Sequence, residues 1–375
     1  MKILYCSQGY SPHDFRFLSA LAQSEHEIHW FKLEKNLVLE NRRLPSSIHP
    51  VSWADDQNPG RWLNYGRLKS EFKKVLHSLQ PDLVHAGPIQ KVSFLAALND
   101  FHPLISMSWG TDLLMDADRD WIWQAVTRFT LRRSDWLIGD CRAVQEKAVS
   151  FGFDGERTTI FPWGIDLDIF KPSESPLLRQ QHEWDDHFVI LCTRNWEPRY
   201  GVELVVHAFC ENAGKMKNAI LVLVGGGSQE GLLRKMVTDF GMSGRVIFAG
   251  RVEYAGLPVY YQAANLYVSA SHSDGSSVSL MEALGCGCPV LVSDIIANRE
   301  WVQPGKQGWL FKDGDWQNLT VEMMDAYQQK DNLHTFRQNA RQTALQKADW
   351  KKNSLMLLST YDKVAGLNVG RILTR

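Results

Sequence analysis

Two carboxylates flank the start of a short apolar run that has helical spacing. Asp274 lies in the preceding polar loop, and Glu282 lies inside the run. Ser276 or Ser277 suits the N-cap of such a helix, whose N-terminus offers unpaired amides to anionic or polar groups. Gly275 lets the backbone approach a ligand closely. We expect Asp274 to accept sugar hydroxyls and Glu282 to accept vicinal hydroxyls, such as those of ribose. A capped helix with a structurally paired glutamate is the alternative.

Two further loops carry groups that suit a diphosphate. Arg194 and Arg199 lie between a strand pattern and a helix pattern, and guanidinium groups give directional charged hydrogen bonds. Gly225 and Gly226 follow an apolar strand pattern and permit close approach to a phosphate or sugar. The alternatives are a solvated basic loop and a simple strand-to-helix turn. The spacing is not that of the GxGxxG fingerprint, which disfavours a dehydrogenase.

The first half of the chain offers a second group of polar residues after strand patterns. Gly9 ends the first of these patterns, and His13 and Asp14 open the helix pattern that follows. His13 is a candidate to bind an acceptor or a phosphate, whereas Asp14 also suits a simple cap. Asp112 follows another strand pattern, where it could act as a base, orient a substrate hydroxyl or cap the next helix.

Strand and helix patterns alternate twice along the 375 residues. Near-continuous apolar strands between helices indicate parallel sheets covered on both faces. The strand patterns lie at 2–7, 27–33, 81–87, 103–110, 135–140 and 158–164, and then at 187–195, 219–227, 245–252, 265–271, 289–295 and 308–311. The fold class is therefore α/β, with two doubly wound domains whose ligands bind where strands end.

The boundaries follow from a charged, proline-containing stretch of weak periodicity. We expect an N-terminal domain at 1–170, a linker at 171–186 and a C-terminal domain at 187–350. The last apolar helix pattern, at about 352–366, has no strand after it. We expect this helix to pack back on the first domain.

Composition excludes several classes of protein. Hydrophobic residues make up 44% and charged residues 22%, which is typical of a globular protein, and the net charge of −1 gives no support for nucleic-acid binding. No apolar run approaches the roughly 18–20 residues that span a bilayer. The cysteines do not have zinc-site spacing and suit free thiols in a reducing cytosol. The Asp-x-Asp pairs lie in turns or at the linker, so we expect no metal site.

The stretch DGSSVSLMEALGCGCPVLVSDIIANREWV resembles the C-terminal signature of the family four retaining glycosyltransferases, also called glycosyl transferases group 1. The arginine loop, the GGG turn, the FPWGIDLDIFKP segment and the N-terminal SPHDFRFL stretch extend the resemblance over nearly the whole chain. The resemblance implies a GT-B fold, in which two Rossmann-like domains face each other across a cleft. It also implies that the N-terminal domain binds the acceptor and the C-terminal domain binds the nucleotide-sugar donor.

The resemblance also implies roles for single residues. Glu282 would bind the ribose, Asp274 the donor sugar, and Arg194 with Arg199 the leaving diphosphate. The remaining expected contacts are the amides of Ser276, Ser277 and Val278 for the sugar or diphosphate, the backbone of Arg251 and Val252 for the base, and Gly9, His13 and Asp112 for the acceptor.

Four departures from the family pattern concern these regions, and one of them is that the N-terminal loop lacks the paired glycines of many members. The first acid is Asp274 where the family usually has glutamate, which shortens its reach by one methylene. Arg199 followed by Tyr200 replaces the usual lysine. Trp109 stands where many members have a histidine.

The implied reaction is metal-independent transfer of a sugar, with retention, from a nucleotide diphosphate sugar to a hydroxyl in cell-surface polysaccharide or glycolipid synthesis. The nucleotide sugar is a co-substrate, and no other cofactor is expected. The acceptor is a carbohydrate, a lipid-linked compound or a small molecule. A nucleotide-sugar epimerase of the same fold and a nucleotide-binding pseudoenzyme are the alternatives.

We expect a cytoplasmic protein, with peripheral contact at the inner membrane face as a further option. That contact would use cations beside two aromatic residues in the first half of the chain, namely Lys32, Lys35, Arg42 and Arg43 with Trp30 and Phe31. An exposed charged loop is the alternative.

Overall fold

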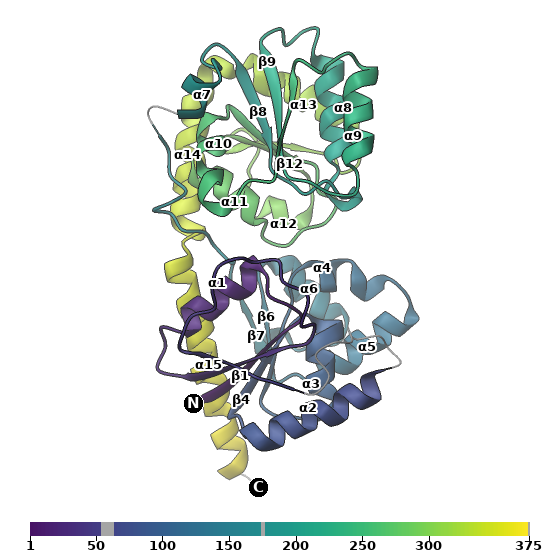
Figure 1. Ribbon diagram of the computed structural model, residues 1–375, viewed down its shortest axis with the longest axis vertical. Helices are drawn as coiled ribbons and strands as arrows, with labels where there is room; N and C mark the ends of the chain where they lie inside the picture. The colour runs from purple at the N-terminus through teal and green to yellow at the C-terminus, as the bar shows by residue number, and fades with distance from the viewer. Residues whose placement is uncertain (54–63, 174–176, 374–375) are drawn as a thin grey trace. The chain divides into compact units, whose positions relative to one another are not determined.

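The computed structural model describes residues 1–53, 64–173 and 177–373, and its side chains up to residue 366. The chain forms two compact units (Figure 1). Unit 1 comprises Met1–Phe161 and Lys352–Arg375, and unit 2 comprises Pro162–Lys351. The expected linker at 171–186 falls within unit 2, and its residues 174–176 lie outside the described residues.

Unit 1 is built on a parallel sheet of seven strands in the order β3-β2-β1-β4-β5-β6-β7. The order reverses between β1 and β4, as in doubly wound folds. The strands are β1 (Lys2–Ser7), β2 (Glu27–Lys32), β3 (Ile48–Pro50), β4 (Leu83–Ala86), β5 (Leu104–Met107), β6 (Trp136–Gly139) and β7 (Thr158–Ile160).

Helices cover both faces of this sheet because successive strand residues point to opposite sides. One face packs against α2 and α3, and the other contacts α1 and α15. The helices are α1 (Pro12–Leu21), α2 (Tyr65–Leu79), α3 (Phe94–Leu98), α4 (Thr111–Leu114), α5 (Trp121–Arg133), α6 (Arg142–Ser150) and α15 (Trp350–Leu373). Shorter helical segments are η2 (Ile89–Ser93), η3 (Asp116–Asp118) and η4 (Gly155–Arg157).

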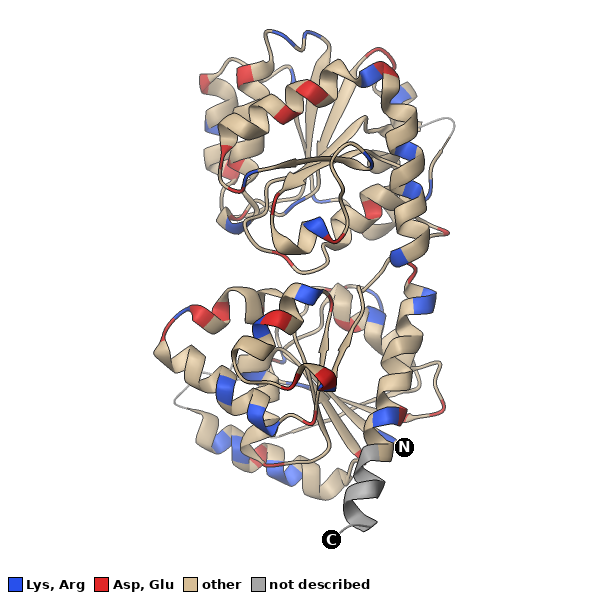
Figure 2. Ribbon diagram, turned by 180° about the vertical axis from the view of Figure 1, so that it is seen from behind, with Lys and Arg blue, Asp and Glu red and all other residues tan. Residues whose placement is uncertain are grey.

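Helix α2 shows how sequence pattern sets the packing. Leu68, Phe72 and Val75 are buried, and they recur at the spacing of one helix face. Figure 2 shows several lysine and arginine residues in blue along α2, and the side chains of these cations are exposed. The apolar face therefore anchors α2 to the sheet while its charged face meets solvent.

Unit 2 repeats the architecture with a parallel sheet of six strands in the order β10-β9-β8-β11-β12-β13. The reversal of strand order falls between β8 and β11. The strands are β8 (Phe188–Cys192), β9 (Ala219–Val224), β10 (Val246–Gly250), β11 (Leu266–Ser269), β12 (Val290–Ser293) and β13 (Gly308–Phe311).

The helices of unit 2 lie on both faces of its sheet. The longer ones are α8 (Val202–Asn212), α9 (Glu230–Asp239), α10 (Leu257–Ala263), α11 (Val278–Gly285), α13 (Trp316–Gln328) and α14 (Leu333–Lys347). The shorter ones are α7 (Leu177–Gln181), α12 (Ile296–Arg299), η5 (Pro198–Tyr200), η6 (Tyr254–Gly256) and η7 (Lys330–Asn332).

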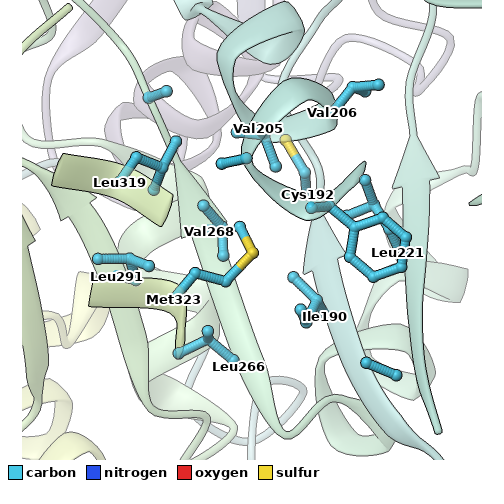
Figure 3. Close-up of a cluster of buried hydrophobic side chains, with 14 of the residues drawn as sticks. Ile190, Cys192, Val205, Val206, Leu221, Leu266, Val268, Leu291, Leu319 and Met323 are labelled. Carbon is cyan, nitrogen blue, oxygen red and sulfur yellow. The ribbon is translucent and has the colours of Figure 1, made fainter. Parts of the chain in front are cut away.

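Strand β8 illustrates why the strands of unit 2 read as continuous apolar runs. Ile190 and Cys192 join a core with α8 and α13, which Figure 3 shows around Val205 and Met323. The alternate residues of β8 join the core on the opposite face, beside α10, α11 and α14. A strand buried on both faces needs apolar residues at every position.

The two-domain α/β architecture expected from the sequence is confirmed. The short edge strand β3 was not among the expected strands. Within the part of the chain that the structure describes, no helix is both long and apolar enough to cross a membrane.

Candidate functional site

The carboxyl ends of β8 and β11 adjoin at the reversal of strand order in unit 2, which is where ligands of open α/β sheets bind. Arg194 follows β8, and Asp274 lies in the loop after β11. The fold therefore brings together two residues that the sequence placed in separate motifs. Helix α11 begins directly after this loop.

Arg194 is the centre of a buried polar cluster. Its Nη2 lies 2.7 Å from Asp274 Oδ2 in an ion pair. Its Nη1 donates hydrogen bonds to Ser277 Oγ at 2.7 Å and to Ser279 Oγ at 2.8 Å. The guanidinium also lies 4.2 Å from the ring centre of Tyr200. Contacts on several sides fix the plane of this guanidinium.

Arg194 stays protonated although it is buried. Burial by itself disfavours the charged form, but the carboxylate of Asp274 outweighs it and holds the pKa of the guanidinium above its ordinary value. The cluster is thus a fixed cation beside a carboxylate, an arrangement that can bind an anion in exchange for Asp274. Among the described residues, no group hydrogen bonds to the buried Nε of Arg194.

Glu282 lies in the middle of α11 and is 4% exposed. Tyr261, on α10, donates its hydroxyl to Glu282 Oε2 at 2.8 Å, and this hydroxyl also lies 2.8 Å from Thr193 Oγ1. Burial, followed by the charge of Glu282, raises the pKa of Tyr261 well above its ordinary value, so the tyrosine stays a donor. The sequence offered no sign that Tyr261 would hold this glutamate.

The start of α11 differs from the expected cap in one respect. Ser277 occupies the N-cap position, but its side chain accepts from Arg194 instead of capping the helix. Ser276 is buried beside Trp301, whose indole lies 3.4 Å from its hydroxyl. Gly275 is buried, and Val278 is the first helical residue. The N-terminal amides of α11 therefore start beside Arg194.

Arg199 has a different environment from Arg194. Its side chain is exposed, and its Nη2 donates to the hydroxyl of Tyr200 at 2.6 Å. Its guanidinium lies 4.6 Å from the ring centre of Tyr200. Tyr200 thus contacts both arginines, which marks it as a residue of the cluster that sequence reasoning treated only as a departure from a pattern.

The glycine turn packs against the loop that carries Arg194. Gly225 has a φ of +143°, and a side chain there would meet the carbonyl oxygen of Arg194 at 2.8 Å. A side chain at Gly226 would lie 3.2 Å from Nε of Arg251. Close packing of backbone on backbone is sufficient to explain Gly225. Arg251 is exposed, and Val252 packs on the core beneath.

Ser228, directly after the glycine turn, already binds a carboxylate. Glu197 accepts from the amide of Ser228 at 2.9 Å and from its hydroxyl at 2.5 Å. These hydrogen bonds lower the pKa of Glu197, so it stays ionised. The Glu197 carboxylate thus joins the loops that follow β8 and β9. The sequence analysis did not single out Glu197.

Unit 1 contains a pocket of about 270 Å³ at its own reversal of strand order. The pocket is lined by residues after β1, β2, β4 and β5 and by residues of α1, η2, α4, η3 and α5. Gly9, His13 and Asp112, which the sequence analysis singled out for the acceptor, all line it. Its further lining residues are Gln8, Tyr10, Ser11, Asp14, Leu37, Leu39, Pro88, Gln90, Lys91, Trp109, Thr111, Asp116 and Trp123.

Two of the expected acceptor residues have clear structural surroundings. A side chain at Gly9 would meet the carbonyl oxygen of Leu37 at 2.6 Å, so glycine allows the two backbones to touch. His13 lies 5.3 Å from Trp109, measured between ring centres. Burial, aided by the charge of Arg16, lowers the pKa of His13 to about 3, so its ring is neutral at pH 7.

Asp112 is bound on both carboxylate oxygens. Oδ1 accepts from the hydroxyl of Ser108 at 2.6 Å and from the amide of Leu113 at 3.0 Å, and Oδ2 accepts from the amide of Ile89 at 2.9 Å. Burial raises its pKa to about 6 in spite of these hydrogen bonds. The carboxylate thus joins η2 to α4.

The aromatic part of the expected membrane contact is wrong. Phe31 is fully buried and Trp30 is 7% exposed, because both belong to β2 in the core of unit 1. Arg42 pairs with Glu40 through its Nη2 at 2.6 Å. Lys35 and Arg43 are exposed, and Lys32 is half-buried.

Metal ligands do not gather in the described part of the chain. No group of three or more histidine, cysteine, aspartate or glutamate side chains there could hold a metal ion. The cysteines are all buried, and all six lie in the described residues.

Both halves of the chain match known protein families. Residues 174–343 match the family described as Glycosyl transferases group 1, and residues 2–140 match the family described as Glycosyl transferase 4-like. A GDP-mannose-dependent alpha-(1-6)-phosphatidylinositol monomannoside mannosyltransferase from Mycolicibacterium smegmatis is 25% identical over 173 residues, which are 44% of this chain and 45% of that protein. The matches span about half the length, or less, of the first curated relatives.

Solved structures share the fold over nearly the full length. Sucrose-phosphate synthase from Thermosynechococcus elongatus has a TM-score of 0.80 at 19% identity, over 98% of this chain and all of the other. Anabaena HepE in complex with UDP has a TM-score of 0.78 at 20% identity, over 97% of this chain and all of the other. At these identities the likeness concerns the fold.

Proposed function

Because the chain belongs to the group 1 glycosyltransferases, we propose that it transfers a sugar from a nucleotide diphosphate sugar to a hydroxyl acceptor with retention of anomeric configuration. The observation that carries this proposal is the Arg194–Asp274 pair beside the start of α11, together with Glu282, which lies one turn further into the same helix. A fixed cation, a hydroxyl-accepting carboxylate and helix amides suit the diphosphate, the ribose and the sugar of one donor.

Glu282 is the proposed ribose ligand. A carboxylate can accept hydrogen bonds from two vicinal hydroxyls, and Tyr261 orients this one through its Oε2. The backbone of Arg251 and Val252 is the proposed contact of the base. Gly225 and Gly226 lie in the turn that packs on the Arg194 loop, and we place the donor's phosphates beside that turn.

The leaving diphosphate is the proposed partner of Arg194. Nη1 stays hydrogen-bonded to Ser277 and Ser279, while the diphosphate oxygens replace Asp274 at the other side of the guanidinium. Asp274 then accepts hydroxyls of the donor sugar. Arg199, held by Tyr200, is the outer cation, and the amides of Ser276, Ser277 and Val278 complete the anion site.

Preorganised charge is what this site would contribute to the reaction. The sugar develops positive charge as the bond to the diphosphate breaks, and Arg194 stabilises the negative charge on the leaving group. We propose that the departing phosphate helps to take the proton of the acceptor hydroxyl, which attacks on the same face. This route needs no covalent nucleophile and no metal ion.

The pocket of unit 1 is the proposed acceptor site, with His13 and Asp112 among its polar groups. A carbohydrate, a lipid-linked compound or a small molecule are the candidate acceptors, in polysaccharide or glycolipid synthesis. Buried thiols at all six cysteines suit the reducing cytosol, which we propose as the location. A peripheral contact with anionic lipid would rest on exposed cations such as Arg43, and flotation with vesicles tests it.

Nucleotide binding tests the donor site. UDP is the first nucleotide to try, because a fold neighbour holds UDP, and GDP and ADP follow. We expect one nucleotide to raise the melting temperature with or without a chelator, since a ligand at about 100 times its Kd adds about 2.7 kcal/mol. Glu282→Ala should abolish this shift.

Product analysis then separates the rival activities. Transfer requires an acceptor and releases a nucleotide diphosphate, whereas an epimerase changes the sugar without any acceptor. A pseudoenzyme binds the nucleotide and leaves the donor intact with every acceptor. Binding without transfer would therefore contradict the proposed function, although the donor site would stand.

A further inference from the structure

The pocket of unit 1 combines aromatic walls with carboxylates and amides. Trp109 and Trp123 contribute indole rings, and the guanidinium of Arg119 lies 5.3 Å from the ring centre of Trp123. Gln8 and Asp116 contribute polar groups. Flat indole faces pack against the apolar faces of sugar rings, while amides and carboxylates bind hydroxyls. This lining suits a polyhydroxylated ring.

The charge of the pocket disfavours an anion. Asp14, Asp112 and Asp116 line it, and among the lining residues, all of them in the described part of the chain, Lys91 is the sole lysine or arginine. Lys91 lies 3.9 Å from Glu34, so its charge is partly compensated. Arg16 is close enough to His13 to affect it, but it does not line the pocket.

The helix N-terminus beside the pocket is already occupied by a carboxylate. Asp14 Oδ2 accepts from the amide of Ser11 at 2.9 Å and from its hydroxyl at 2.6 Å, which closes a capping box at the start of α1. Pro12 contributes no N–H there. The positive end of α1, which would otherwise attract a phosphate, is therefore neutralised from within the chain.

The second helical start at the pocket is occupied in the same way. Asp112 accepts from the amides of Ile89 and Leu113, which belong to η2 and α4. Both backbone sites that could hold a phosphate are thus filled by carboxylates of the protein. A phosphorylated ligand would meet these carboxylates, and the nearby cations include Lys91, which pairs with Glu34, and Arg119, which lies over the Trp123 ring.

We propose that the pocket of unit 1 binds an uncharged glycosyl acceptor, whose sugar ring lies against the tryptophans, and excludes phosphorylated sugars. This inference rests on the proposed transferase function and names its acceptor class. The buried Nδ1 of His13, to which no described group hydrogen bonds, is a further site for a hydroxyl of that sugar.

Matched pairs of sugars test the acceptor class in the full chain. The probes are methyl glucoside, methyl galactoside, methyl mannoside and methyl N-acetylglucosaminide, each beside its 6-phosphate. Binding is measured by calorimetry with the donor nucleotide present, and transfer is measured by nucleotide release. We expect at least one uncharged probe to bind, with an affinity at least about tenfold higher than that of its phosphate.

Two pairs of variants localise the effect. Trp123→Ala should abolish binding of the uncharged probe, whereas Trp121→Ala should not, because Trp121 is 77% exposed and does not line the pocket. Asp116→Lys should reduce the ratio of the affinity for an uncharged probe to the affinity for its 6-phosphate. Asp116→Asn should reduce this ratio by a smaller factor. Glu146→Lys adds the same charge to an exposed position of unit 1 and should leave the preference unchanged.

The outcomes separate this inference from the function on which it rests. Equal or tighter binding of the phosphates overturns the acceptor class, as does binding of no uncharged probe while the nucleotide still binds. Equal losses from Trp123→Ala and Trp121→Ala overturn the location. Donor binding without nucleotide release for any probe, although uncharged probes bind, contradicts the transferase and leaves the pocket assignment standing.

Discussion

At the scale of single residues, Arg194 is the group on which the donor site depends. Its guanidinium contacts Asp274, Ser277, Ser279 and Tyr200, so one side chain joins the loops after β8 and β11 to the start of α11. Arg199 has the same charge but is exposed and bonds Tyr200. Replacing Arg194 and replacing Arg199 should therefore have different effects on the stability of the protein and on the rate of transfer.

Alanine at each position measures this difference. Arg194→Ala removes the cation from a largely buried pair, and we expect it to lower the free energy of unfolding by about 3 kcal/mol. Its rate of transfer should fall about 10²–10³-fold, since charge stabilisation of the leaving group is lost. Urea unfolding and steady-state kinetics measure the two effects.

Arg199→Ala is the matched control for this comparison. It removes an exposed side chain, so its effect on unfolding should stay within about 0.5 kcal/mol. Its rate should fall by about tenfold at most. Equal losses of rate in the two variants would contradict the assignment of Arg194 as the main cation.

The residue types of the site were readable from the sequence, but their partners were not. Asp274, Glu282 and Arg194 follow strand patterns or start a helix, and strand ends are where ligands bind. The Arg194–Asp274 pair joins loops after two different strands, so it depends on β8 and β11 becoming neighbours. Tyr261 and Glu197 were missed for the same reason, because each binds a residue distant in sequence.

At the scale of elements, α15 links the end of the chain to the sheet of unit 1. Tyr361 is fully buried, and its hydroxyl lies 2.6 Å from Nδ1 of His85 on β4. Thr360 donates to Thr159 on β7 at 2.9 Å. These contacts hold a helix that starts in unit 2 against strands of unit 1.

Tyr361→Phe tests this attachment. The variant keeps the ring but leaves His85 Nδ1 buried without its partner, which should cost about 1–3 kcal/mol of unfolding free energy. Amide hydrogen exchange should become faster in α15. Ser359→Ala, at an exposed position of the same helix, should change neither quantity, and an unchanged Tyr361→Phe would show that packing alone holds the helix.

Element boundaries followed from the sequence where burial dictates the pattern. The expected strand at 2–7 is β1, and the apolar run after Pro289 is β12, since strands covered on both faces must be apolar throughout. β3 has three residues at a sheet edge, which is too short to produce a pattern. Helix α1 begins at Pro12, earlier than its apolar face suggests, because the Ser11–Asp14 capping box sets its start.

At the scale of the whole molecule, the buried histidines and aspartates whose pKa values are shifted lie in unit 1. Burial lowers the pKa of His85 to about 3, and of His13 to about 3 with help from Arg16. Burial also raises the pKa of Asp14 and of Asp112 to about 6. The two types of group act in opposite directions on stability as the pH falls.

His85 should make the protein less stable in acid. Between pH 6.5 and pH 3 the unfolded chain binds a proton at this histidine and the folded chain does not, so unfolding is favoured as the pH falls. The loss should reach about 2 kcal/mol at pH 5. His85→Gln should remove it, and chemical unfolding at pH 7 and pH 5 measures the difference.

Asp112 should have the opposite effect over a similar range. Its pKa is about 6 in the folded chain and ordinary in the unfolded chain, so between about pH 6 and pH 4 the folded state binds the extra proton and gains stability. Asp112→Asn removes this gain and should make the decline of stability between pH 7 and pH 5 steeper than in the wild type, whereas His85→Gln makes it shallower. Because the two contributions partly cancel, the pH dependence of the wild type alone would not reveal either of them. If Asp112→Asn and His85→Gln changed the slope of unfolding free energy against pH in the same direction, the opposite effects assigned to Asp112 and His85 would be contradicted.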